Sequence, residues 1–222
     1  MDTKVSSSQI DYEEGYHEVR HATHYNDDYY EARARIALKK FFSGTDKQAE
    51  ILDFGCGLGQ NIYYMPNAQG YDISQHGVAF CAKKGIKATN NLEDLPDNYF
   101  KHVFSAHVLE HHPHPKSMLN DINSKMVTGG ELILVLPYER HSHPNTYDLD
   151  INQHLYCWNF QSINNLLITS GFKIVNNRYI RGAGYNKLLP LFKFNFNLYW
   201  YATNLLSRIV GIREMMIVAT KV

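Results

Sequence analysis

Residues 51–59 read ILDFGCGLG, an apolar run that ends in three alternating glycines. The run predicts a short buried strand over residues 50–54, and the glycines predict the turn after it. Glycine lets a backbone turn sharply and lets a ligand lie against it without a Cβ in the way. The spacing differs from the GxGxxG loop of dinucleotide-binding proteins. Since open parallel sheets bind ligands beyond the ends of their strands, we expect a ligand here; an ordinary turn is the alternative.

Strand and helix patterns alternate around this stretch, which predicts an α/β fold with a parallel sheet covered by helices on both faces. The expected strands are 50–54, 69–72, 86–89, 102–106, 131–137, 172–178 and 215–220. The expected helices are 31–42, 74–84, 116–126 and 160–170, with a further short helical piece between the glycines and Pro66.

Composition and charge narrow the class of protein. The 222 residues suit one domain, and 22 basic against 22 acidic residues argue against a uniformly basic nucleic-acid binder. Three scattered cysteines are too few for a disulfide framework, and the first residues lack the apolar core of a secretory signal, so we expect a cytoplasmic protein. Residues 173–222 carry eight bases and a single acid, Glu214.

Two polar stretches follow the second and third expected strands. Asp72 ends the second strand, where a carboxylate can accept two hydrogen bonds from a ribose diol; the alternative is a turn or cap aspartate beside Ser74. Residues 90–96, NNLEDLP, can supply a side-chain acceptor and a backbone N–H to an adenine edge.

Taken together, these motifs resemble those of the class I S-adenosylmethionine-dependent methyltransferases. The resemblance is carried by ILDFGCGLG (51–59), YDIS (71–74), NNLEDLP (90–96), SAHVLEHHPHP (105–115) and GGELILVLP (129–137). It implies a doubly wound seven-stranded Rossmann-like sheet with its last strand antiparallel. It also implies S-adenosylmethionine as cofactor and a methyl transferase activity, most simply toward an oxygen of a small molecule or a glycan precursor.

The same resemblance implies a set of cofactor-binding residues. The methionine portion would be held by Asp53, Gly55, Cys56, Gly57 and Gly59. The ribose would be bound by Asp72, with adenine against Ile73, the Leu92 N–H and the Asn91 carbonyl oxygen; Glu93 and His107 complete the set.

Seven of the twelve histidines lie between residues 107 and 154, in the region where the acceptor would bind. In one interpretation His111 or His154 is the general base that takes the acceptor's proton. In the other, His107, Glu110, His111 and His154 bind a metal ion, since residues 107–111 resemble the ExxEH motif of quinone-pathway and small-RNA methyltransferases with His in the first position. A structural role for Glu110 and His111 is the third interpretation.

Residues 1–45 are expected to form an N-terminal cap, 46–180 the cofactor-binding core, 182–213 an inserted lid and 214–222 the last strand. The basic, aromatic insertion suits a lid or homodimer surface, a peripheral membrane contact, or stacking on RNA. The competing functions are therefore an RNA or lipid-quinone methyltransferase and a non-catalytic binding subunit.

Overall fold

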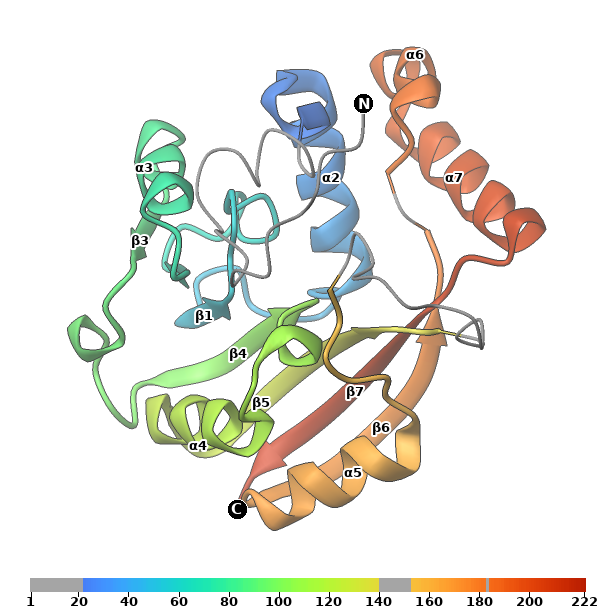
Figure 1. The fold of residues 1–222 in the computed structure, drawn as a ribbon. Coiled ribbons are helices and arrows are strands. Elements are labelled where there is room, and N and C mark those ends of the chain that lie inside the picture. The colour runs from blue at the N-terminus through green and yellow to red at the C-terminus, as the bar shows by residue number, and fades with distance from the viewer. Residues whose placement is uncertain (1–21, 140–152, 183) are drawn as a thin grey trace, which may run out of the picture.

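A computed structural model describes residues 22–139, 153–182 and 184–222, in which seven strands form one mixed sheet (Figure 1). The strand order is β3-β2-β1-β4-β5-β7-β6. The strands are β1 (Ile51–Phe54), β2 (Gln69–Tyr71), β3 (Lys87–Thr89), β4 (Phe100–Ala106), β5 (Met126–Pro137), β6 (Phe172–Ile180) and β7 (Glu214–Lys221). Only β7 runs antiparallel to its neighbours, so the predicted fold is confirmed.

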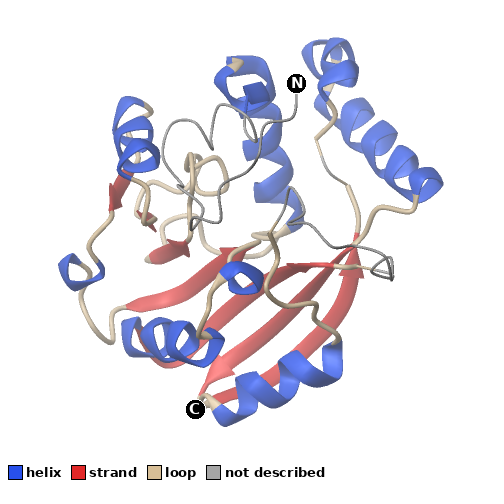
Figure 2. Cartoon of the chain, in the orientation of Figure 1, coloured by secondary structure: helices blue, strands red, loops and turns tan. Residues whose placement is uncertain are grey.

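Helices cover both faces of this sheet (Figure 2). The longer helices are α2 (Asp27–Lys40), α3 (Gln75–Lys83), α4 (Pro115–Lys125), α5 (Phe160–Thr169), α6 (Leu189–Phe194) and α7 (Phe196–Val210). On one face α4 and α5 bury Leu119 and Ile163 in the larger core. On the other face Leu38 and Phe41, at the end of α2, pack on a second core around Phe104.

Several expected boundaries were wrong for local reasons. The residues between Gly59 and Pro66 form turns instead of the predicted short helix. The first helix begins at Asp27 because the Asn26 side chain accepts the Tyr29 N–H and caps it. Gly129 and Gly130 do not terminate α4 but lie within β5, which starts at Met126.

The predicted insertion contains a short 3-10 turn, Asn186–Leu188, and then α6 and α7, which form a hairpin beside α2 (Figure 1). The hairpin builds a third, smaller core with α2 from Tyr29, Ile36, Leu189 and Tyr199. Within the described residues, no helix is long and apolar enough to cross a membrane. The predictions for Tyr12, Tyr16, His141 and His143 lie outside those residues.

Candidate functional site

The glycine loop after β1 is tied to the end of β2 by main-chain and carboxylate hydrogen bonds. The Gly55 and Cys56 N–H groups both donate to the Tyr71 carbonyl, at 2.7 and 3.0 Å. The Asp72 carboxylate accepts from Gly57 N at 2.7 Å and from Ser74 N at 3.0 Å. Asp72 therefore fixes the loop as well as facing the position where a ribose is expected.

One side of the loop is closely packed and the other is open. A Cβ on Gly55, whose φ is +85°, would lie 2.1 Å from Cγ2 of Val108. A Cβ on Gly77 of α3 would lie 2.8 Å from the Gly57 carbonyl oxygen, whereas one on Gly57 would meet no atom within 4 Å. Such an exposed strip of glycine backbone fits the methionine portion of S-adenosylmethionine.

Asp53 and Cys56 lie beneath the loop. The Asp53 carboxyl is fully buried, and this burial raises its pKa to about 8, although the Asn61 side chain opposes the shift and Asp72 adds to it. Cys56 is also buried, and Cys81 together with desolvation raises the pKa of its thiol. Both groups pack the underside of the loop, so a direct cofactor contact for either remains a prediction.

The predicted adenine site lies along the same edge of the sheet. Ile73 follows Asp72 and leaves 61% of its surface exposed, as a side chain that packs on a ligand would. Asn91 caps the 3-10 turn Leu92–Asp94, where its side-chain oxygen accepts the Glu93 N–H at 3.2 Å. That oxygen thus already has a main-chain donor, and its predicted contact with adenine is untested.

A second cluster forms where the loop before α5 folds onto the turn after β4, the 3-10 turn Leu109–His111. The Glu110 carbonyl accepts the N–H groups of Leu155 and Tyr156 at 2.9 and 3.2 Å. These bonds bring the His154 ring to His111, with ring centroids 4.7 Å apart. The structure therefore joins the two predicted histidines, which are 43 residues apart in the chain.

Buried Glu110 lies at the centre of this cluster. Its Oε1 is 3.4 Å from His107 Nδ1 and 4.0 Å from His154 Nε2. Burial lowers the pKa of His111 despite the nearby Glu110 carboxylate, so its imidazole is neutral near pH 7. Potential ligand atoms of Glu110, His111 and His154 all lie within 4.8 Å of one another, which brings together three of the four residues of the predicted metal set.

Glu139, which the sequence analysis missed, supports His154. Its carboxylate forms a short hydrogen bond to His154 Nδ1 and accepts one from the Cys157 thiol. This bond leaves His154 Nε2 on the side of Glu110. Glu139 directly follows the expected strand 131–137 with one residue between, so its position at the strand end was the available signal.

The fourth predicted ligand, His107, is held by a different set of charges. His107 Nε2 lies 2.9 Å from Glu214 Oε1, and Lys40 Nζ lies 2.5 Å from Glu214 Oε2. Desolvation lowers the pKa of His107, but hydrogen bonds with Glu110 and Glu214 outweigh it and raise the pKa to about 9. With 43% of the side chain exposed, we attribute this balance to the two carboxylates.

Lys40 also donates to the Gly182 carbonyl at 3.0 Å. Gly182 and Glu214 flank the insertion, so one buried ammonium of α2 holds both of its ends. Burial alone would raise the pKa of Glu214, but His107 and Lys40 hold it below its usual range. We call Lys40, His107, Gly182 and Glu214 the clasp.

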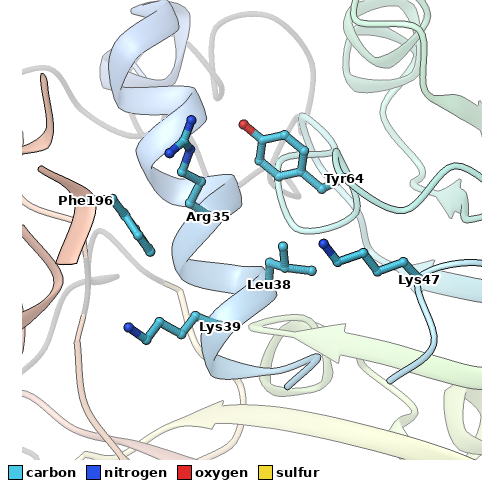
Figure 3. A pocket seen from close by; sticks show the side chains of 6 residues that line it. All are labelled: Arg35, Leu38, Lys39, Lys47, Tyr64 and Phe196. Atoms are coloured by element: carbon cyan, nitrogen blue, oxygen red, sulfur yellow. The ribbon is translucent and has the colours of Figure 1, made fainter. Parts of the chain in front are cut away.

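The most evident hollow is separate from both clusters. It has a volume of about 380 Å³ and lies between α2, the start of α7 and the turns around β1 (Figure 3). Its lining is Arg35, Leu38, Lys39, Lys47, Tyr64 and Phe196. None of the predicted site residues is in that lining.

Comparison with known proteins is consistent with this geometry. A family model described as a methyltransferase domain matches residues 22–177. A probable tocopherol O-methyltransferase of rice is 27% identical over 119 residues, which are 46% of this chain and 33% of the relative. The match thus spans about a third of that relative's length.

Solved structures share the fold at low sequence identity. An S-adenosylmethionine-dependent methyltransferase from Archaeoglobus fulgidus is 20% identical, with a TM-score of 0.57 over 85% of this chain and 94% of that one. Magnesium protoporphyrin IX methyltransferase from Synechocystis, solved with bound cofactor, is 15% identical, with a TM-score of 0.59 over 98% of this chain and 100% of that one.

Proposed function

The chain belongs to the methyltransferase-domain family, whose cofactor is S-adenosylmethionine, and we propose that it transfers the methyl group to an oxygen of a small molecule or glycan precursor. The observation that carries this proposal is the open glycine strip at Gly57, tied to Asp72 and lying on the same edge of the sheet as the neutral His111. The distant likeness to a tocopherol O-methyltransferase also favours an oxygen acceptor.

The loop and its neighbours would hold the cofactor by the groups already described. The open backbone of Gly55 and Gly57 would take the methionine portion, the Asp72 carboxylate the ribose hydroxyls, and Ile73 one face of adenine. Bound there, S-adenosylmethionine supplies an electrophilic methyl group. Holding the acceptor close to that methyl group gives much of the acceleration.

An oxygen acceptor also has a proton to lose, and the histidine cluster can take it. His111 is neutral near pH 7 because burial lowers its pKa, so it has the protonation state that a base needs. His154, hydrogen-bonded to Glu139 through Nδ1, turns Nε2 toward Glu110 and lies against the His111 ring. We propose His111 as the base, with His154 as the alternative.

The same cluster supports a second mechanism. One buried carboxylate and two imidazoles, whose ligand atoms lie within 4.8 Å of one another, form a donor set for a divalent transition metal better than for Mg²⁺. A metal there would lower the pKa of the acceptor hydroxyl instead of accepting its proton.

Transfer of a labelled methyl group to a panel of small-molecule, glycan, quinone and RNA acceptors tests the activity. With an oxygen acceptor, His111→Ala is expected to lower turnover about 10²–10⁴-fold without changing the affinity for S-adenosylhomocysteine. Turnover of the wild type should rise with pH through a pKa below about 6.5, and a chelator should have no effect.

Other outcomes identify the alternatives. Loss of activity with chelator, restored by added divalent ion, would establish the metal mechanism instead. Wild-type turnover in both His111→Ala and His154→Ala would contradict the base, and cofactor binding without transfer to any acceptor would favour a binding subunit.

A further inference from the structure

Helix α7 has its large apolar side chains on the wrong side for a helix that lies on a protein in water. Its buried face carries Tyr199, Thr203 and Ser207, and the last two hydroxyls donate to carbonyls of the preceding turn. The opposite face, with Phe194 from the end of α6, exposes five large apolar side chains that we call the outer stripe: Phe194, Leu198, Tyr201, Leu205 and Ile209.

The outer stripe is continuous and strongly exposed. Residues 198, 201, 205 and 209 are spaced by three or four, so they share one face of the helix. Leu205 and Ile209 leave 60% and 74% of their surface accessible, and Phe194 leaves 83%. Water-soluble helices place such side chains inward, and an exposed apolar patch of this kind marks an interaction site.

The charge around the stripe indicates what covers it. Residues 182–213 contain Lys187, Lys193, Arg208 and Arg213 and no acid. Lys193 pairs with Asp28, and Arg213 stacks on Tyr138, but no carboxylate of the described residues pairs with Lys187 or Arg208. A second copy of the chain docked through the same stripe would bring these like charges together, whereas an anionic surface would neutralise them.

We propose that the outer stripe of α7 docks on the surface of an anionic lipid bilayer. The helix would lie in the plane of the interface, with its apolar side chains below the headgroups and Arg208 at their level. Its 15 residues are too short to cross the hydrocarbon, in agreement with the absence of a membrane-crossing helix from the described residues. This proposal does not depend on the identity of the methyl acceptor.

Docking in this way would place the glycine loop and the histidine cluster near the membrane. The hairpin stands beside α2 at the end of the sheet where β5 ends and β7 begins (Figure 1). The clasp joins its base to His107 and Glu110. An acceptor dissolved in the bilayer would then meet the site without crossing bulk water.

Sedimentation with vesicles of phosphatidylcholine, with or without phosphatidylserine, tests the proposal on the full chain. We expect the wild type to bind the phosphatidylserine vesicles and to be released by high salt. The double variant Leu205→Glu/Ile209→Glu should bind at least about tenfold less, because two buried apolar side chains are lost from the contact. Arg208→Gln/Lys187→Gln should weaken binding and reduce its salt dependence.

A matched control replaces equally exposed apolar side chains elsewhere. Ile168 in α5 and Val175 in β6 are 57% and 59% exposed, so Ile168→Glu/Val175→Glu adds the same charges without touching the stripe and should bind as the wild type does. Circular dichroism and affinity for S-adenosylhomocysteine should be equal in all variants. A wild type that does not bind, an equal loss in both glutamate variants, or a wild-type dimer that Leu205→Glu/Ile209→Glu dissociates would overturn the proposal.

Discussion

Asp72 has two tasks at one position, since it both ties the glycine loop and faces the expected ribose. Asp72→Ala should weaken the binding of S-adenosylhomocysteine by about 1.5–3 kcal/mol, the cost of removing a charged hydrogen-bonding partner. Calorimetry measures this change.

Gly77→Ala separates those two tasks. Its new Cβ would press on the Gly57 carbonyl oxygen from 2.8 Å and disturb the loop while Asp72 keeps its carboxylate. A smaller loss for Gly77→Ala than for Asp72→Ala is expected. Unchanged affinity in Asp72→Ala would make this residue a turn aspartate only.

Asp53 predicts a pH dependence of stability. Its carboxyl has a pKa of about 8 in the folded chain, because of burial, and about 3.9 when unfolded. Between these values the folded state binds the extra proton, so this group makes stability fall as pH rises from about 4 to about 8. Asn cannot titrate, so the stability of Asp53→Asn relative to wild type should increase across that window.

Urea unfolding of both proteins near pH 5 and near pH 8 measures this difference. Parallel pH profiles would show that the Asp53 carboxyl is already ionised in the folded chain.

At the scale of elements, the clasp joins α2, the turn after β4 and both ends of the insertion through one buried ion pair. Lys40→Met leaves Glu214 buried without its ammonium partner, which should lower the free energy of unfolding by about 2–4 kcal/mol. The matched control is Lys84→Met, which breaks the pair with exposed Asp27 and should cost about 1 kcal/mol or less.

Chemical denaturation compares the two variants. The double variant Lys40→Met/Glu214→Leu should recover much of the loss, since neither charge is then left alone. Equal costs for Lys40→Met and Lys84→Met would contradict the clasp as a structural link.

At the scale of the whole molecule, the sheet and the hairpin should differ in mobility. Strands β1, β4 and β5 are almost wholly buried at their ends near the site, whereas α7 exposes its entire outer face and rests on the small third core. Hydrogen exchange should therefore be faster in residues 186–210 than in these strands.

Cofactor and vesicles should affect different parts in that experiment. S-adenosylhomocysteine should protect the glycine loop, and phosphatidylserine vesicles should protect α7. Protection of the hairpin equal to that of the strands, unchanged by either ligand, would indicate a permanent part of the core instead.

The sequence alone determined the parts of the fold that depend on neighbouring residues. The apolar run at 51–54, the alternating glycines and Asp72 predicted a strand, a turn and a ligand edge, because strand periodicity and positive φ at Gly55 and Gly57 are local properties. The same local signals failed where capping or tight turns decide, as at Asn26 and between Gly59 and Pro66.

Tertiary structure decided which distant side chains meet. Lys40, His107 and Glu214 come together because the sheet order places the start of β7 beside the end of β5, which no short pattern encodes. His154 reaches His111 through main-chain bonds to Glu110. The aromatic, basic composition of the insertion was visible in the sequence, but only the packing of Tyr199, Thr203 and Ser207 on the inside showed which face of α7 is left to a partner, since a helix that is apolar on two sides gives no periodic signal of its orientation.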